Sequence, residues 1–498
     1  MGRRREEAYE LRKSRARFHL RQRVAGHPVN GDEARHLNKI ASHTKGLPHH
    51  DSGEVELTAW AALVRACNSG RPADFDAVPL GGTLRFVCPQ AALAFDMEGA
   101  DSHRLGIPAA PRFDSAEQAS EMAELYWLAL LRDVPFAGYP THPLVATACE
   151  DLSRFSDFRG PKQAGVVTPA TLFRGPWAGD LEGPYLSQFL LRPIPHGAMD
   201  VEQRLRLPVP GRDFVLTPED WLINLDGATT RERIMFDSVP RHLRTGRDLS
   251  EWVHRDYPCQ AGLHAALILD GLDVQLSPEL PYVAGTNQEG FVTFGLPCVI
   301  DLMSRSAVSA LKAAWFQKWR VHRRLRPEEY AGRVHHFIES NRPYPIPPEL
   351  LLSEVLARVF TEIGGYFLPL GYPEGCPSHP SYPGGHATFA GATVTVLKAL
   401  YDESWVLPNP VQPRADGLGL EPYTGPPLTV GGELNKLASN IAIGRNFGGV
   451  HWRTDAREGN LLGEEVAINI LRDHFHTFNE PFDGFRLTKF DGTAILIR

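Results

Sequence analysis

The apolar residues of this chain recur at helical spacing, in segments bounded by glycine and proline. Helical patterns cover 259–272, 298–322, 348–366, 386–402, 432–446 and 456–472, and an earlier one follows capping residues at 114–117. No alternation of strand and helix patterns repeats along the chain. The sequence therefore predicts a mainly α class, a large helical-bundle architecture with long loops and a few short hairpins, for which Phe214–Leu216 is a candidate strand.

The length of 498 residues suits two or three average domains or one large one. No internal repeat or low-complexity linker marks a boundary. We expect a loop-rich part over 1–260, which would supply support and oligomer contacts. A helical bundle over 261–498 would carry the chemistry, and the two parts would form one compact unit.

The net charge of -7 gives no reason to expect nucleic acid as a partner. The charge is unevenly spread, because nine Lys/Arg fall within the first 23 residues. Glu6, Glu7 and Glu10 are interleaved with them. This mixture is more typical of a helix that docks or pairs than of a nucleic-acid-binding tail.

No apolar segment is long enough for a signal peptide or a membrane span, so we expect a cytoplasmic protein without a membrane partner. The six cysteines are scattered and form no Cys-x-x-Cys pair. This spacing excludes the common Cys-based zinc modules and argues against a dense disulfide framework.

The first chemically informative segment is 318–327, which holds five basic residues within nine positions. It closes a predicted helix, and the helix dipole accounts for some of this charge. Lys318 and Arg326 are eight residues apart, so one can point inward from the last turn while the other reaches back from the loop. Two cations that converge on one point indicate an anion there.

The second segment is 379–392, where proline and glycine precede an apolar helical run. This order places the backbone amides of Gly384 and Gly385 at a helix N-terminus, which is a ready anion site. His386 lies in the first turn, where its imidazole can act as an acid or base. A glycine-rich loop with only a capping role is the alternative interpretation.

The third segment is 445–455, which follows another predicted helix. His451 and Asp455 are four residues apart and would share one face of a new helix. An aspartate that accepts the Nδ1 proton frees Nε2 to ligate a metal centre. A surface His–Asp pair at a helix start is the alternative interpretation.

Taken together, the three segments favour one pocket for a tetrahedral oxyanion. Lys318, Arg326 and Arg445 can neutralise its charge, and arginine can do so bidentately. His451 is then a nucleophile or metal ligand, and His386 the acid or base. This chemistry supports either phosphoryl transfer through a phosphohistidine or stable binding of vanadate, because vanadate readily adopts the five-coordinate geometry of phosphoryl transfer.

These segments resemble the signature of the vanadium haloperoxidase and type-2 acid phosphatase superfamily: Lys-x7-Arg-Pro, Pro-Ser-Gly-His and Arg-x5-His. The phrases KWRVHRRLRP, HPSYPGGHAT and NIAIGRNFGGVHW are most similar to the algal and cyanobacterial bromoperoxidases. The similarity also includes 43–55, 89–101, 173–191 and about 248–269. It implies a vanadate-dependent haloperoxidase that oxidises bromide or iodide with hydrogen peroxide. The product would be a hypohalous-acid equivalent that halogenates organic acceptors.

The resemblance also implies a role for each motif residue. His451 would be the vanadium ligand, and Lys318, Arg326, Arg445 and the amide of Gly385 would bind the vanadate oxygens. Lys318, His386 and His451 would be the catalytic residues, with His386 as the acid or base. His379 and Asp455 would lie just behind the vanadate-binding residues.

One position departs from the family pattern, which has serine where this chain has Gly384. A lost hydrogen bond to a charged group costs about 1.5–3 kcal/mol if nothing replaces it. A water or the amide of Gly384 is a candidate replacement.

Two further functions stay open on the sequence. One is an acid phosphatase with His451 as the phosphorylated nucleophile. The other is a non-catalytic oxyanion-binding protein in which Gly384 marks decay of the site. For the haloperoxidase, the expected partners are hydrogen peroxide, a halide, an organic acceptor, and further copies of the chain in a homodimer or larger homo-oligomer.

Overall fold

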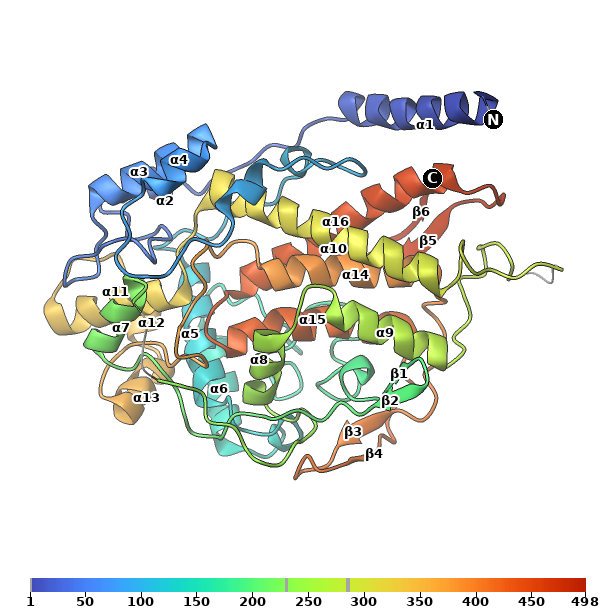
Figure 1. The fold of residues 1–498 in the computed structure, drawn as a ribbon. Helices are drawn as coiled ribbons and strands as arrows, with labels where there is room; N and C mark the ends of the chain where they lie inside the picture. Colours follow the sequence, from blue (N-terminus) through green and yellow to red (C-terminus); the bar gives the residue numbers. More distant parts are fainter. Residues whose placement is uncertain (1, 229–231, 284–286) are drawn as a thin grey trace.

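A computed structural model of the protein describes residues 2–228, 232–283 and 287–498. The described chain is mostly helical, which confirms the predicted mainly α class (Figure 1). Its α-helices are α1 (Gly2–Arg21), α2 (Asp32–Arg35), α3 (Leu57–Ser69), α4 (Pro72–Asp76), α5 (Ala116–Leu130), α6 (Pro143–Arg154), α7 (Pro218–Leu225), α8 (Gly246–Arg255), α9 (Gln260–Gly271), α10 (Leu296–Phe316), α11 (Pro327–Ser340), α12 (Pro348–Leu351), α13 (Glu354–Ile363), α14 (Gly385–Leu400), α15 (Val430–Phe447) and α16 (Arg453–His474).

Short helical turns join several of these helices. They are η1 (Pro89–Leu93), η2 (Ser102–Arg104), η3 (Phe136–Gly138), η4 (Gln188–Leu190), η6 (Phe475–Thr477) and the π-helical turn η5 (Gln317–His322).

Three antiparallel hairpins complete the described chain. They pair β1 (Ile194–His196) with β2 (Met199–Val201), β3 (Val411–Pro413) with β4 (Leu420–Pro422), and β5 (Phe485–Thr488) with β6 (Ala494–Ile497). The hairpins predicted in general terms are therefore present, but the candidate strand Phe214–Leu216 was wrong. Phe214 makes a single bridge to Leu370, which is too distant in the chain to form a hairpin with it.

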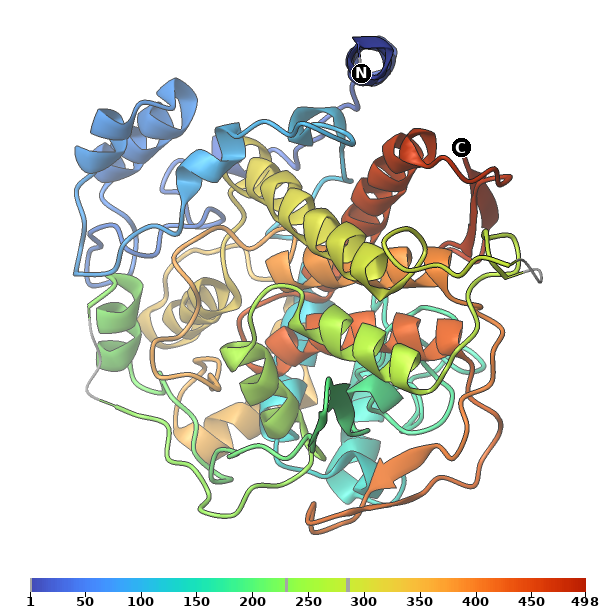
Figure 2. The same cartoon turned by 45° about the vertical axis from the view of Figure 1, so that its right-hand side comes forward.

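Helix α14 lies in the middle of the bundle and packs against α10, α15 and α16 (Figures 1 and 2). Glycines allow the close approach of α14 to α16. A Cβ atom on Gly391 would lie 2.3 Å from the carbonyl oxygen of Asn460, and one on Gly463 would lie 2.0 Å from that of Thr388. This packing brings the N-terminal ends of α14 and α16 together, where the amide of Gly384 donates to the carbonyl of Asp455.

The predicted helical segments match the observed helices, with three local differences. The segment predicted at 348–366 is two helices, and of the capping residues predicted at 114–117 the one whose side chain caps α5 is Ser115. The last six residues of the helix predicted to end at 322 form the π-helical turn η5, and Arg323 after it has a left-handed φ of 41°.

The largest buried cluster includes side chains from both sides of position 260, among them Trp127, Trp221 and Trp452. A smaller cluster places Trp60 and Trp319 together. In the described chain, no helix combines the length and hydropathy needed to cross a membrane. Helix α1 has no buried residue although it spans 20 residues, and it lies at the edge of the molecule in both views (Figures 1 and 2).

Candidate functional site

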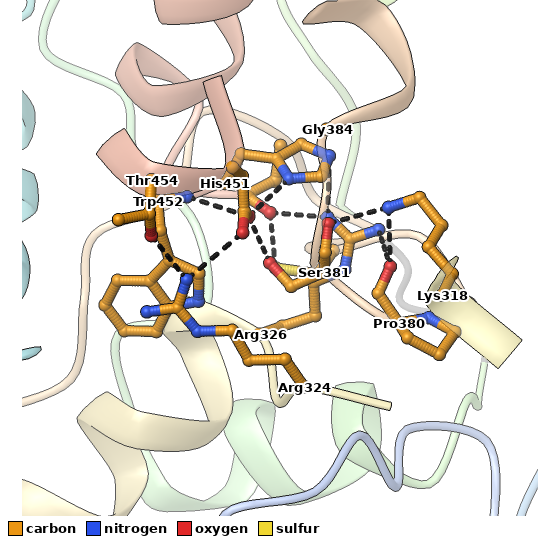
Figure 3. A network of polar contacts seen from close by, with 12 residues as sticks. Lys318, Arg324, Arg326, Pro380, Ser381, Gly384, His451, Trp452 and Thr454 are labelled. Atoms are coloured by element: carbon orange, nitrogen blue, oxygen red, sulfur yellow. Dashed lines mark hydrogen bonds and ion pairs between the residues drawn. The ribbon is translucent and has the colours of Figure 1, made fainter. Parts of the chain in front are cut away.

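The three motif segments meet where several helices begin or end (Figure 3). Lys318 lies in η5, and Arg326 is the residue that precedes α11. Gly385 begins α14, Arg445 lies in the last turn of α15, and His451 precedes α16. Residues far apart in the sequence thus come together in the fold.

Lys318 points its ammonium group at backbone carbonyls. Its Nζ donates to the carbonyl oxygens of Pro380 at 2.7 Å and Ser381 at 2.6 Å. Burial, together with the nearby charge of Arg326, lowers the pKa of Lys318 well below its usual value. A bound anion would favour the charged form of this lysine.

Arg326 connects the second and third segments. Its guanidinium donates to the carbonyl oxygens of His379 at 2.9 Å and Val450 at 2.6 Å. Its Nη1 also lies 3.0 Å from Nε2 of His451. Because arginine only donates hydrogen bonds, Nε2 of His451 is the acceptor in this contact.

His451 therefore carries its proton on Nδ1, which lies 2.7 Å from the carboxylate of Asp455. Burial, with the charges of Arg326 and Lys318, lowers the pKa of His451 well below its usual value. A neutral imidazole with its lone pair on Nε2 is the form that ligates a metal.

The predicted contact between His451 and Asp455 is present, but the predicted helical face was wrong. His451 lies before α16, and Asp455 is in its first turn. The Asp455 carboxylate folds back to accept the amide of Trp452 at 3.0 Å, and the same oxygen reaches His451. Capping of the helix, not i to i+4 spacing on its face, makes this pair.

Two residues that the sequence analysis did not single out also hold Asp455. The hydroxyl of Ser381 donates to Oδ2, and Nη1 of Arg324 lies 3.2 Å from Oδ1. Arg324 in turn pairs with Glu121 at 2.8 Å. Both Ser381 and Arg324 lie inside the motif segments, so their position was the only available signal.

Arg445 is held by groups outside the three segments. Its Nη1 donates to the carbonyl of Val253 at 2.9 Å, and its guanidinium carbon lies 5.2 Å from the ring centre of Tyr372. Its buried Nε has no hydrogen-bond partner in the part of the chain that the structure describes.

At the start of α14, the two glycine amides differ. The amide of Gly385 makes no hydrogen bond to any described residue, as an anion-binding amide requires. The amide of Gly384 already donates to the carbonyl of Asp455 at 2.9 Å. The suggestion that the Gly384 amide replaces the missing serine hydroxyl was therefore wrong.

His386, the expected acid or base, is paired with a carboxylate. Its Nε2 lies 2.9 Å from Oδ1 of Asp256, and its side chain is 25% exposed. Burial lowers the pKa of His386, although Asp256 opposes this effect. Asp256 follows α8, 130 residues earlier, and no local pattern marks it in the sequence.

His379 contacts the site directly through Arg326. Its Nδ1 lies 3.0 Å from Nη2 of Arg326, and burial lowers its pKa well below the usual value. The ring of Trp315 lies against it, with 4.8 Å between ring centres. Trp315 also covers Gly385, where a Cβ atom would meet its ring at 3.2 Å.

The cations of this site lack anionic partners. Lys318 and Arg326 are fully buried, and Arg445 is 6% exposed. Within residues 2–228, 232–283 and 287–498, none of their side-chain nitrogens lies within 4.0 Å of a carboxylate oxygen. Since buried charges are normally paired, an oxyanion such as vanadate fits this donor set.

Comparisons with known proteins agree with this chemistry. The sequence model of a family described as the VCPO second helical-bundle domain matches residues 357–480. Vanadium-dependent bromoperoxidases from Corallina pilulifera and Ascophyllum nodosum are each 34% identical to this chain. Both matches cover 98% of this chain. They cover 98% of the Corallina pilulifera protein and 92% of the Ascophyllum nodosum protein.

A solved structure is similar over almost the whole chain. It is the homohexameric structure of the second vanadate-dependent bromoperoxidase from Ascophyllum nodosum, with a TM-score of 0.94 and 31% identity. The match covers 99% of this chain and 90% of that one.

Proposed function

This chain belongs to the vanadium-dependent haloperoxidases, and from this membership we propose that it oxidises bromide with hydrogen peroxide on bound vanadate. Iodide, which is easier to oxidise, would also be a substrate, and chloride would be disfavoured. The product would be a hypohalous-acid equivalent that halogenates organic acceptors. Full-length similarity to proteins named for bromide supports this choice of halide.

The observation that carries the proposal is the set of buried cations around His451. Lys318, Arg326 and Arg445 converge without a carboxylate partner among the described residues, and Nε2 of His451 faces them with its lone pair. A site with this composition requires an anion that also accepts a nitrogen ligand. Vanadate meets both requirements.

Each residue then has a defined task in holding the cofactor. Nε2 of His451 would be the protein ligand, and Lys318, Arg326, Arg445 and the amide of Gly385 would bind the oxygens. When bound, vanadate supplies a Lewis acid that activates peroxide without a change of oxidation state. Asp455 keeps the proton of His451 on Nδ1, so Nε2 keeps the lone pair that a metal ligand needs.

His386 would handle protons during turnover. An ionised Asp256 can only accept a hydrogen bond, so it holds the His386 proton on Nε2. Nδ1 is then the nitrogen that can take up a proton and return it. This assignment makes His386 the acid or base and Asp256 the residue that orients it.

We also propose that the chain forms a homo-oligomer. The structurally similar bromoperoxidase from Ascophyllum nodosum is described as homohexameric, and the match covers 90% of that chain. The number of subunits in this protein is a separate question that its mass in solution answers.

The proposal is tested by reconstituting vanadate-free protein with orthovanadate and measuring peroxide-dependent bromination of a dye. We expect activity with bromide and iodide, little with chloride, and none in His451→Ala. His103→Ala, a change at an exposed histidine, is the matched control and should retain activity.

The same preparations should be assayed for hydrolysis of p-nitrophenyl phosphate. Phosphate release that depends on His451, without bromination, would identify a phosphatase instead. Binding of vanadate without either reaction would identify a non-catalytic oxyanion-binding protein.

A further inference from the structure

Helix α1 has a single polar anchor on the rest of the described chain. Of its 20 residues none is buried, and its ion pairs to other elements go to one carboxylate, that of Asp473. Nε of Arg15 lies 2.7 Å and Nε2 of His19 lies 2.8 Å from this carboxylate. Helices in proteins are stabilised mainly by packing. Helix α1 buries no residue against the rest of the chain, so a large part of its surface is available to a partner.

The charge of this surface is opposite to that of the remaining chain. Helix α1 contains eight Lys/Arg and three Glu, so with histidine neutral its net charge is +5. The whole chain carries -7, which leaves -12 on the remainder. Several of these arginines have no carboxylate within 4.0 Å among the described residues: Arg4, Arg5, Arg12, Arg17 and Arg21.

Two exposed apolar side chains lie in a segment that shares the anchor of α1. Phe95 is 81% exposed and Met97 is completely exposed. They precede Gly99, whose amide donates at 2.7 Å to Asp473, the same carboxylate that anchors α1. Exposed apolar side chains that are held next to a charged surface are typical of protein interfaces.

We propose that α1 together with Phe95 and Met97, here called the arm surface, docks on a second copy of this chain. The inference rests on the homo-oligomer proposed above and names the surface that forms it. The unpaired arginines would contact the acidic remainder of the neighbouring copy, and the two apolar side chains would be covered.

Two other classes of partner fit this surface less well. Helix α1 has no continuous apolar face, which a helix that lies in a membrane interface needs. A nucleic acid would meet three glutamates within the helix and the -12 charge of the remaining chain. A second copy would place the positive α1 of one chain against the negatively charged remainder of the other.

The experiment measures assembly mass against concentration by size-exclusion chromatography with light scattering. The arm variant carries Arg5→Glu, Arg12→Glu and Arg17→Glu. The control carries three reversals at other exposed arginines: Arg71→Glu, Arg154→Glu and Arg486→Glu. The control should assemble like the wild type. The arm variant should need at least a tenfold higher protein concentration to reach the same assembled fraction.

A second variant tests the apolar part without altering charge. Phe95→Ser with Met97→Ser should also weaken assembly, and it should leave bromination by the vanadate-loaded protein unchanged. Unchanged bromination shows that the variant is folded.

Each result has a distinct meaning. A monomeric wild type would contradict the homo-oligomer itself. An oligomeric wild type with unchanged assembly of both arm-surface variants would overturn the role of the arm surface alone. If the arm variant instead loses binding to anionic vesicles or to DNA while assembly persists, the surface serves that other partner and the inference is wrong.

Discussion

Gly384 lies where the family pattern has serine, and its surroundings define what a side chain would meet. Its φ of -67° is open to any residue, so the backbone does not require glycine. A Cβ atom would lie 3.1 Å from the carbonyl oxygen of Asp455, which is a tight contact. A serine at this position would therefore add a hydroxyl, and α16 would have to shift slightly because it contains Asp455.

We expect Gly384→Ser to bind vanadate more tightly than Gly384→Ala. Both variants add the same Cβ contact with Asp455, and only serine adds a hydroxyl donor. A hydrogen bond to a charged group contributes about 1.5–3 kcal/mol, or roughly ten- to hundredfold in Kd. Calorimetric titration with vanadate measures the ratio, and equal affinity of the two variants would show that the hydroxyl does not reach the cofactor.

No sequence pattern marked Asp256. Its contact with His386 predicts that changing it slows turnover more than it weakens vanadate binding. Asp256→Asn should lower kcat for bromide at least tenfold, because the proton on His386 loses its anionic acceptor. Vanadate affinity should change less than twofold, and the pH profile of kcat should shift. Asp301→Asn, at an exposed position, is the control. A weaker Kd for vanadate with normal kcat would assign Asp256 to cofactor binding.

At the scale of elements, α11 depends on the segment at 43–45. The side chain of Glu329 accepts the amide of Arg326 at 2.6 Å, and its other oxygen accepts the amide of Thr44 at 2.7 Å. Burial alone would raise the pKa of Glu329, but the contact with His43 and the hydrogen bonds from these amides lower it to about 2. The start of α11, and with it Arg326, is thus fixed by a segment far from the site in sequence.

This arrangement predicts a pH-dependent loss of stability in Glu329→Gln. At pH 7 the variant should be less stable by about 2 kcal/mol, because charge-assisted hydrogen bonds in the interior are lost. A carboxylate with a lowered pKa stabilises the fold above its unfolded pKa of about 4.5, and this contribution disappears as the pH falls toward 2. Thermal melts should therefore show the largest difference above pH 5. A difference that stays constant down to pH 3 would exclude this cause.

The helices that hold the site were predictable, and several of their contacts were not. Periodicity located α14, α15 and α16, and the motif segments located Lys318 and His451. The link from His386 to Asp256 was missed because it joins distant segments. Periodicity also could not show that Asp455 turns back to cap its helix.

At the scale of the whole molecule, the site exists only when segments that are far apart in the chain fold together. Its three cations come from 318 to 445 and repel one another in the interior. Orthovanadate should therefore raise the Tm by a few degrees, since a ligand at a hundred times its Kd adds about 2.7 kcal/mol. Differential scanning fluorimetry of wild type and Lys318→Ala tests this. An equal rise in both would place the binding elsewhere.

The contact between Nη1 of Arg326 and Nε2 of His451 has a consequence for the rate at which cofactor loads. While this hydrogen bond exists, the nitrogen that would ligate vanadium is covered by the protein itself. Arg326 must turn aside before the ligand bond forms, so loading includes a step that does not depend on cofactor concentration. In stopped-flow experiments the loading rate should rise with vanadate and then level off, and the plateau would give the opening rate of this arginine.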